Sequence, residues 1–288
     1  MATIPMELLH RYSAALAEAR AEAESKSSTA LSRLRGRGTV ASCRDAAIDV
    51  IETCLEQYGG AAASAALDLF DEVMIAEGLR ITGSMPSGIY TKSEVDRIAR
   101  YQAGKLRDDD WDGFTAQVAK SVGHLVYQGG NRTMLAQSGL YTDGRNYVFR
   151  KGWGRARWSY KGGRRPTSGY QIRWARVPQG EETCDFCLML ASRGFVYVSE
   201  ASAQGYEGHV HRGCDCIVVP GVGHYEAGTT NYMGSEWQQD TVLEGYDTNA
   251  MRDLWKTWAS ISEGDGSRED KHAAKLAAMQ DAMGRTEW

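Results

Sequence analysis

Apolar residues recur at three- and four-residue spacing along the first half of the chain, which is the pattern of amphipathic helices. Leu9, Tyr12 and Leu16 open the first apolar stripe, and the sequence up to residue 26 contains no helix breaker. We therefore expect helix within residues 1–35. The hydroxyl residues at 27–29 either interrupt this helix or cap a second short one.

Residues 39–78 carry two apolar stripes in succession. Gly59-Gly60 separates the stripes, and glycine commonly follows the last turn of a helix. The pattern predicts one helix that ends at this pair and a second helix over 61–77. Cys43 and Cys54 fall on the first stripe, and because a free thiol packs as a small apolar group, we expect both to be buried and free.

Two more helices are predicted before residue 140. The first runs from Lys92 to Leu106, after a loop that contains Gly and Pro. The acidic run at 108–110 has the composition of a helix cap, so the second helix begins at Trp111. We expect it to continue to about Ser138, with an interruption near the glycine pair at 129–130.

The second half mixes short strands with short helices. From residue 170 to residue 177 polar and apolar side chains alternate, which predicts a strand with Ile172 and Trp174 on its buried face. The other expected elements are a helix at 184–192, strands at 195–198 and 217–220, an amphipathic helix within 241–261 and a polar helix at 268–283. The expected fold class is α+β, with a mainly α-helical N-terminal half followed by a small α+β module.

Length and composition indicate a globular protein of more than one domain. The chain has 288 residues, 42% of them hydrophobic and 24% charged. Composition shifts near residue 145, so we expect a helical domain at 1–144, a basic segment and α+β module at 145–220, and a helical tail at 221–288. No apolar run approaches the roughly 20 residues of a membrane span, and the first residues lack the pattern of a secretory signal.

Cysteine and histidine cluster in the second half of the chain. Four of the six cysteines and two of the six histidines fall between residues 184 and 216. A tetrahedral zinc ion takes four such ligands, and a full set of protein ligands leaves no position for a reacting water. The candidate ligands, called the cysteine cluster below, are Cys184, Cys187, His211, Cys214 and Cys216. His209 is a further candidate, and the spacing leaves open which four ligands bind.

The expected cofactor is therefore a structural zinc ion, with no catalytic residue assigned. A deaminase places H-x-E before P-C-x-x-C, whereas here the Cys-x-x-Cys comes first, and the H-E-x-x-H motif of zinc peptidases is absent. The alternatives are free thiols that bind no metal, and disulfides formed only in an oxidising medium. A redox role for the Cys-x-x-Cys pair lacks the βαβ pattern that usually surrounds it.

A basic segment precedes the cysteine cluster. Residues 145–176 contain ten Lys or Arg and no Asp or Glu, although the whole chain has a net charge of -4. Interleaved aromatic and glycine residues give the composition that contacts a phosphate backbone without reading its sequence. The candidate contacts are Arg150, Lys151, Arg155, Arg157, Lys161, Arg164 and Arg165. The alternative is a solvated surface that pairs with the acidic remainder of the chain.

The arrangement of the cysteine cluster resembles a known motif. Thr183-Cys184-x-x-Cys187, then a helix, then His211-x-x-Cys214-x-Cys216 is similar to the C-terminal motif of MuF-like phage minor head proteins. The sequence from Cys187 to Tyr197 resembles minor capsid proteins of actinobacterial phages or prophages. The resemblance covers about residues 170–220. The family often has an acidic residue ahead of the Cys-x-x-Cys, and here Gln179-Gly-Glu-Glu182 takes that place. The middle residue of the Cys-x-Cys is often basic in the family and is Asp215 here. Neither feature removes a ligand.

The resemblance implies a non-enzymatic virion component. Such proteins lie inside the head near the portal, present in few copies, and take part in head morphogenesis and in DNA packaging or ejection. The implied partners are the portal, the major capsid or scaffold protein, and packaged DNA, with no membrane. The implied location is the virion interior, and the host cytoplasm during assembly. The alternative is a zinc-stabilised nucleic-acid enzyme, such as a nuclease or toxin.

Overall fold

The computed structural model describes residues 2–78, 90–137, 169–179, 185–197, 216–225, 237–263 and 265–267, with several positions between 270 and 278. This part of the chain is mostly helical and contains a few short strands, as the sequence predicted. The chain divides into two compact units. The helical unit comprises 10–69 and 84–137, and the mixed unit comprises 1–9, 70–83 and 138–288.

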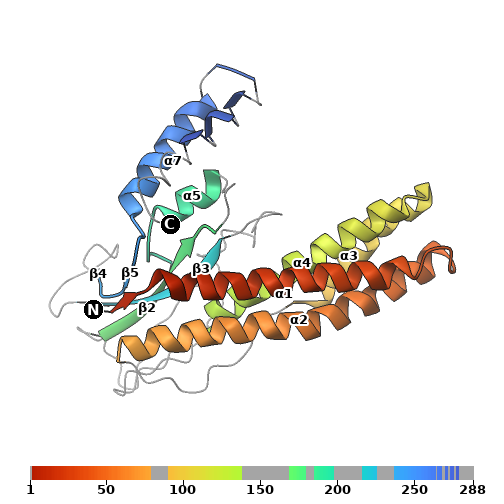
Figure 1. The fold of residues 1–288 in the computed structure, drawn as a ribbon, viewed down its shortest axis with the longest axis horizontal. Coiled ribbons are helices and arrows are strands. Elements are labelled where there is room, and N and C mark those ends of the chain that lie inside the picture. Colours follow the sequence, from red (N-terminus) through yellow and green to blue (C-terminus); the bar gives the residue numbers. More distant parts are fainter. Residues whose placement is uncertain are drawn as a thin grey trace, which may run out of the picture. The chain divides into compact units, whose positions relative to one another are not determined.

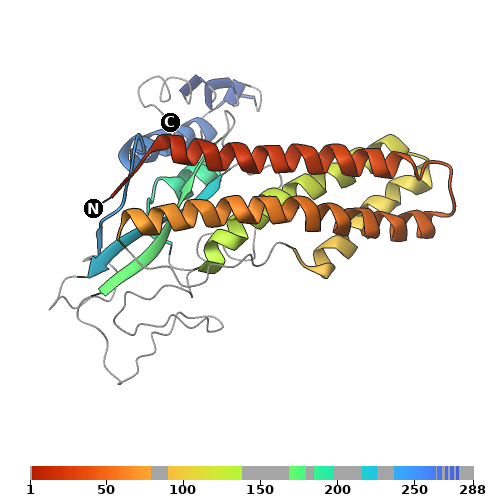
Figure 2. The same ribbon diagram turned by 60° about the horizontal axis from the view of Figure 1, so that its bottom comes forward.

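Long helices form the helical unit. They are α1 (Met6–Ser32), α2 (Val40–Ala76), α3 (Lys92–Gln102) and α4 (Trp111–Ala136), with the 3-10 helix η1 (Ala103–Asp108) between the last two. Helices α1 and α2 lie side by side and run in opposite directions (Figures 1 and 2). Their facing sides are apolar, and Leu16 of α1 and Leu55 of α2 are fully buried. Burial of these stripes accounts for most of the stability of such helices.

The glycine pairs do not end helices, and both predictions of a break there are wrong. Helix α2 continues through Gly59-Gly60, and α4 continues through Gly129-Gly130. Gly130 lies where α4 meets α1 and α2, since a Cβ at Gly130 would lie 2.5 Å from Leu16 Cδ2 and 3.1 Å from the Ala62 carbonyl oxygen. The small residue therefore permits close packing of three helices instead of marking an end.

The hydroxyl run at 27–29 also lies within a continuous helix. The Ser27 hydroxyl is buried and donates to the Ala23 carbonyl at 2.6 Å, and the Thr29 hydroxyl donates to the Ser25 carbonyl at 2.9 Å. These bonds satisfy the hydroxyls one turn back along α1, so the helix needs no break.

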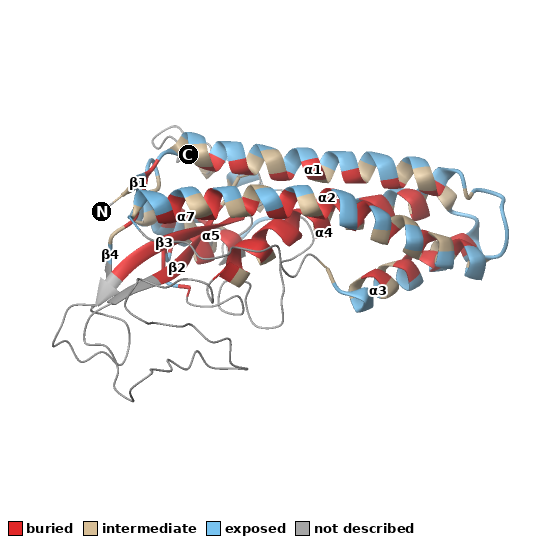
Figure 3. Cartoon of the chain, turned by 90° about the horizontal axis from the view of Figure 1, so that it is seen from below, coloured by how far each residue is buried: buried red, intermediate tan, exposed pale blue. Residues whose placement is uncertain are grey.

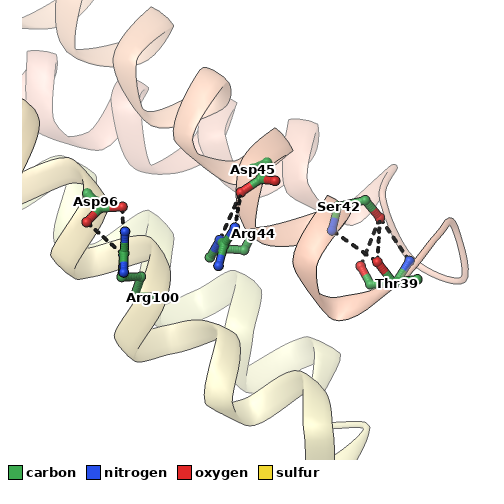
Figure 4. Close-up of polar contacts among 6 residues, drawn as sticks. All are labelled: Thr39, Ser42, Arg44, Asp45, Asp96 and Arg100. Atoms are coloured by element: carbon green, nitrogen blue, oxygen red, sulfur yellow. Dashed lines mark hydrogen bonds and ion pairs between the residues drawn. The ribbon is translucent and has the colours of Figure 1, made fainter.

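Side-chain caps mark the helix starts. At the start of α2, the Thr39 amide donates to Ser42 Oγ at 2.8 Å and the Ser42 amide donates to Thr39 Oγ1 at 3.2 Å (Figure 4). The predicted acidic cap of α4 is confirmed, because Asp110 Oδ1 accepts from the Gly113 amide at 2.9 Å. The predicted helix from Lys92 ends earlier than expected, at Gln102, where it tightens into η1.

The mixed unit is built on an antiparallel sheet. Strand β2 (Gly169–Val177) pairs with β3 (Ile217–Tyr225), and β3 pairs with β4 (Trp237–Gln239). Strand β3 extends beyond the predicted end at residue 220. Helix α5 (Asp185–Ala191) packs against β2 and against α7 (Thr248–Glu263). The strand predicted at 195–198 is reduced in the described part to an isolated bridge between Tyr197 and Trp174.

The sequence predicted that one face of β2 is buried, but in the structure both faces are. Every residue from Ile172 to Val177 is buried, including Arg173 and Arg176 (Figure 3). A strand that is covered on both faces has no solvent-exposed side. The alternation of polar and apolar residues in β2 therefore does not separate buried from exposed positions. The two arginines are the unusual consequence, because arginine is rarely fully buried.

The start of the chain belongs to the mixed unit, which the sequence did not predict. Strand β1 (Thr3–Ile4) pairs in parallel with β5 (Val242–Leu243), a segment far away in the sequence. Ile4 and Leu243 are both buried in this pairing. A two-residue strand carries too little periodicity to be recognised from sequence.

Cys43 and Cys54 are buried and free, as predicted. Within the described residues, no helix is both long enough and apolar enough to cross a membrane. The predicted helix at 268–283 is described only at some positions between 270 and 278, and these are helical.

Candidate functional site

Two tyrosine hydroxyls cap the last turn of α5. The Tyr197 hydroxyl donates to the Leu190 carbonyl at 2.7 Å, and the Tyr246 hydroxyl donates to the Ala191 carbonyl at 2.6 Å. Gly194 then takes the left-handed conformation, with φ 64°, and ends the turn. The carbonyls at the end of a helix need such partners when water is excluded, so these hydroxyls fix the position of α5.

Tyr246 also ties α5 to the sheet. Its hydroxyl lies 2.8 Å from the Arg176 carbonyl oxygen of β2, in addition to its bond to Ala191. Burial raises the pKa of Tyr246 well above its ordinary value, with a smaller contribution from Cys216. The hydroxyl therefore stays protonated as a donor, and its two acceptors place β2 and α5 in a defined relation.

Two residues of the cysteine cluster lie in this part of the mixed unit. Cys187 lies in α5 and Cys216 lies directly before β3. Neither is in a disulfide, and both are almost completely buried, with exposed fractions of 1% and 0%. Both interact electrostatically with Tyr197. Burial is the main reason why the pKa of Tyr197 rises to about 12, and the two thiols add to the rise. Residues from two separate elements thus converge on one tyrosine.

Arg176 belongs to the same neighbourhood. It is 2% exposed and pairs across the sheet with Val218, two residues after Cys216. Cys216 lies just before the paired register, whose last pair is Val177 with Ile217, so Arg176 lies near the end of the sheet that Cys216 precedes. Arg176 opposes the rise in the pKa of Tyr197, as expected of a nearby positive charge.

The rest of the predicted site lies outside the described residues. This applies to Cys184, His211 and Cys214, and also to His209. It applies equally to the predicted nucleic-acid contacts Arg150, Lys151, Arg155, Arg157, Lys161, Arg164 and Arg165. In the parts of the chain that the structure describes, no three His, Cys, Asp or Glu side chains gather as metal ligands would.

The two described cysteines fit a zinc site as part of its donor set. Their thiols are soft donors that zinc favours, they come from separate elements, and they are not joined in a disulfide. Metal binding by these two cysteines, the identity of the metal and the other ligands all stay predictions.

Sequence reasoning missed the residues that support these cysteines. Tyr197, Tyr246 and Arg176 were not assigned a role, although Tyr197 and Arg176 lie near the motif in sequence. No spacing rule points to them, because a hydroxyl donor to a helix carbonyl is found only once the chain has folded.

The helical unit contains a second group of polar contacts. Arg132 on α4 makes a two-point ion pair with Glu94 on α3, with Nη2 2.6 Å from Oε1 and Nη1 3.1 Å from Oε2. Burial opposes ionisation of Glu94, but the bonds from Arg132 and from Thr91 outweigh burial and lower the pKa of Glu94. This arrangement holds α3 against α4 and offers no free ligand or nucleophile.

Two more exposed ion pairs lie within single helices, one at the start of α2 and one in α3. Arg44 pairs with Asp45, and Arg100 pairs with Asp96 (Figure 4). Hydrogen bonding to Asp96 is the largest cause of the raised pKa of Arg100, and Asp45 contributes. Exposed ion pairs of this kind add little stability, so we regard them as features of the solvated surface.

Comparison with known proteins identifies the family of the chain. The model of a family described as VG15 protein matches residues 3–148 and 167–258, which is most of the sequence. The Gene 15 protein of Mycobacterium phage D29 is 36% identical over an alignment of 74 residues that covers 16% of this chain and 27% of that protein. The matched part is thus less than two thirds of this relative. No solved structure matches the chain.

The family and this relative indicate a phage protein. The family match begins before α1 and ends within α7, so it includes both compact units. The chain belongs to the VG15 protein family.

Proposed function

We propose that this chain is a structural component of a phage virion, a minor head protein that acts in head morphogenesis and in DNA packaging or ejection near the portal. The observation that carries the proposal is the family match across both units, together with a relative encoded by a phage. The resemblance of the cysteine cluster to the MuF-like motif supports the more specific role.

The helical unit is the part we assign to contacts with portal, capsid or scaffold protein. Tyr101 on α3 is 78% exposed and is the most exposed large apolar side chain among the described residues. Large exposed aromatic residues are enriched at the centres of protein interfaces. Tyr101 is therefore the first residue to test for contact with another head protein.

We assign contact with the packaged DNA to the mixed unit. The cysteine cluster would bind one zinc ion in a closed, structural site, with Cys187 and Cys216 among its ligands. When bound, zinc would cross-link α5, the start of β3 and the chain between them. The basic segment 145–176 would lie against packaged DNA and contact its phosphates without sequence preference. No residue is assigned a catalytic role.

Analysis of particles tests this function. Virions of the phage that encodes the chain are separated on a density gradient, and their proteins are quantified by mass spectrometry. We expect the chain in DNA-filled heads at far fewer copies than the major capsid protein. Purified full-length chain should also bind purified portal, capsid or scaffold protein in a pull-down assay.

Two results would contradict the proposal. Absence of the chain from heads and from their assembly intermediates would exclude a virion component. Zinc-dependent cleavage of DNA or RNA by the purified chain, abolished by Cys187→Ser without loss of the fold, would favour the nucleic-acid enzyme instead.

A further inference from the structure

The turn between α1 and α2 concentrates positive charge in a chain that is acidic as a whole. Residues 25–44 contain no Asp or Glu and five basic residues, which are Lys26, Arg33, Arg35, Arg37 and Arg44. We call residues 33–38 the arginine turn. Its three arginines are exposed to solvent, at the end of the α1–α2 pair (Figures 2 and 3).

The backbone of the arginine turn is held in one conformation. Gly36 and Gly38 take the left-handed region, with φ 71° and 86°, which allows the chain to reverse between the two helices. The Arg37 amide donates to the Leu34 carbonyl at 2.9 Å, and the Cys43 thiol donates to the Arg37 carbonyl at 3.2 Å. A backbone that is already ordered loses less entropy when a partner binds.

The guanidinium groups of the turn are available to a partner. Arg33 and Arg37 form no ion pair with any residue that the structure describes, and Arg35 Nη1 lies 3.2 Å from Asp112 Oδ1 on α4. The side chains of Arg35 and Asp112 are 60% and 89% exposed. An ion pair as exposed as this one contributes little, so another anion can replace the carboxylate.

The chemistry of the turn favours a phosphate backbone. The planar fork of a guanidinium matches two phosphate oxygens, and the glycines beside the arginines leave room for close approach. Leu34, the apolar residue of the turn, is only partly exposed. The centre of a protein interface is instead poor in charged residues and rich in aromatic ones.

We propose that the arginine turn binds the phosphate groups of DNA without reading its sequence, as a surface separate from the basic segment 145–176. The inference goes beyond the proposed function, because it gives the helical unit a nucleic-acid contact of its own. It depends neither on the basic segment nor on zinc.

The experiment measures binding of a fluorescent DNA duplex to the full-length chain at several salt concentrations. Each phosphate contact contributes about 0.9 to the slope of log affinity against log salt. Replacement of the three arginines by glutamine (Arg33→Gln, Arg35→Gln and Arg37→Gln together) should therefore lower the size of the slope by about 2–3. The loss of affinity should be equal for duplexes of unrelated sequence.

A matched control removes the same charge elsewhere in the helical unit. Lys92, Arg97 and Lys120 are exposed on α3 and α4, and their replacement by glutamine should leave the slope within about one of the wild type. Replacement of the three turn arginines by lysine keeps their charge and should also keep the slope.

Exposed substitutions rarely unfold a protein, and circular dichroism checks the fold of each variant. If the triple glutamine variant does not fold, Arg33→Gln and Arg37→Gln are measured singly. Each single variant should lower the slope by about one.

Substitution of Asp112 should have the opposite effect. Asp112→Asn removes the carboxylate that contacts Arg35, so the variant should bind the duplex more tightly than the wild type. Asp68→Asn is the control, because it removes an exposed carboxylate from the middle of α2, and it should change affinity less.

Three results would overturn the proposal. The first is a wild-type slope in the glutamine variant, or an equal loss in the α3–α4 control. The second is a loss in the lysine variant as large as in the glutamine variant, which would show that charge is not the cause. The third is wild-type binding to DNA with loss of binding to polyglutamate, which would assign the turn to an acidic protein partner.

Failure of the proposed function is distinguishable from these results. Substitution of Arg164 and Arg165 tests the basic segment in the same assay, and absence of the chain from virions tests the virion role. Neither outcome alters the salt slope expected from the arginine turn.

Discussion

Thr241 donates its buried hydroxyl to Glu77 Oε1 at 2.5 Å, joining the residue after α2 to the segment before β5. The same hydroxyl accepts from the Val222 amide of β3 at 2.8 Å, and the same carboxylate oxygen accepts from the Ala2 amide at 3.2 Å. One threonine and one glutamate thus link strands and helix ends that are far apart in the sequence.

Thr241→Val should therefore destabilise the mixed unit. The substitution preserves the shape but leaves the Val222 amide and the Glu77 carboxylate without this partner, a loss of about 1–3 kcal/mol. Urea denaturation measures the change. Thr257→Val on the exposed face of α7 is the control, since its hydroxyl bonds only within the helix, and it should change stability much less. If the two substitutions lower the free energy of unfolding equally, the hydrogen bond to Glu77 adds no stability beyond that of a bond within a helix.

Alanine substitutions at two helical glycines should change stability in opposite directions. A Cβ at Gly130 would meet Leu16 at 2.5 Å, so Gly130→Ala should destabilise the helical unit by about 1–3 kcal/mol. No atom lies within 4 Å of a Cβ at Gly60, so Gly60→Ala should stabilise α2 by about 0.5–1 kcal/mol. Thermal unfolding of both variants tests the pair. Stabilisation by Gly130→Ala would refute the close packing of α4 against α1.

Acid should weaken the contact between α3 and α4. The folded pKa of Glu94 is lowered, so the Arg132 ion pair contributes its full stability above the ordinary glutamate pKa, about 4.3, and loses it as the pH falls through the folded value. The difference in unfolding free energy between the wild type and Glu94→Gln should be constant near neutral pH and shrink below about pH 4. A difference that does not change between pH 7 and pH 3 would contradict this role.

Tyr246→Phe should loosen α5. The change removes one hydroxyl that two buried carbonyls share, at a cost of about 1–3 kcal/mol. Hydrogen exchange should report faster exchange of α5 amides, while amides in α4 keep their protection. Tyr101→Phe is the control, because this tyrosine is exposed and should tolerate the change. Unchanged exchange in α5 would mean that Tyr197 and Gly194 suffice to hold it.

Tyr101→Ala tests the proposed partner surface. Substitution of an exposed side chain usually changes stability by less than about 0.5 kcal/mol, so the variant should fold normally. We expect it to bind portal, capsid or scaffold protein more weakly in the pull-down assay, and Tyr101→Phe to retain binding. Full binding by the alanine variant would place the contact surface elsewhere.

Much of the helical unit was predictable because its signals are local. The apolar stripe from Leu9 to Leu16 and the Asp110 cap each lie within a few residues, and both appear in the structure where expected. The helix breaks predicted at the glycine pairs are wrong because glycine can either end a helix or allow helices to pack closely. At Gly130 it permits close helix packing, and only the positions of Leu16 and Ala62 reveal that use.

The sequence was enough to propose Cys187 and Cys216 as candidate ligands, but it gave no signal for the residues around them. Residue type and spacing in the sequence point to Cys187 and Cys216. The structure places both in the buried neighbourhood of Tyr197. Tyr246 has no comparable signal, because its acceptors are backbone carbonyls of Arg176 and Ala191, which any sequence contains.

The sequence by itself determined the helical periodicity, the helix caps and the clustering of cysteine and histidine between residues 184 and 216, since each depends on residues close together along the chain. Only the tertiary structure decided that β1 pairs with β5, that the Thr241 hydroxyl donates to the Glu77 carboxylate, and that the Tyr246 hydroxyl reaches the Arg176 carbonyl of β2. These relations depend on the register of distant segments, which many side chains specify together and which no short stretch encodes.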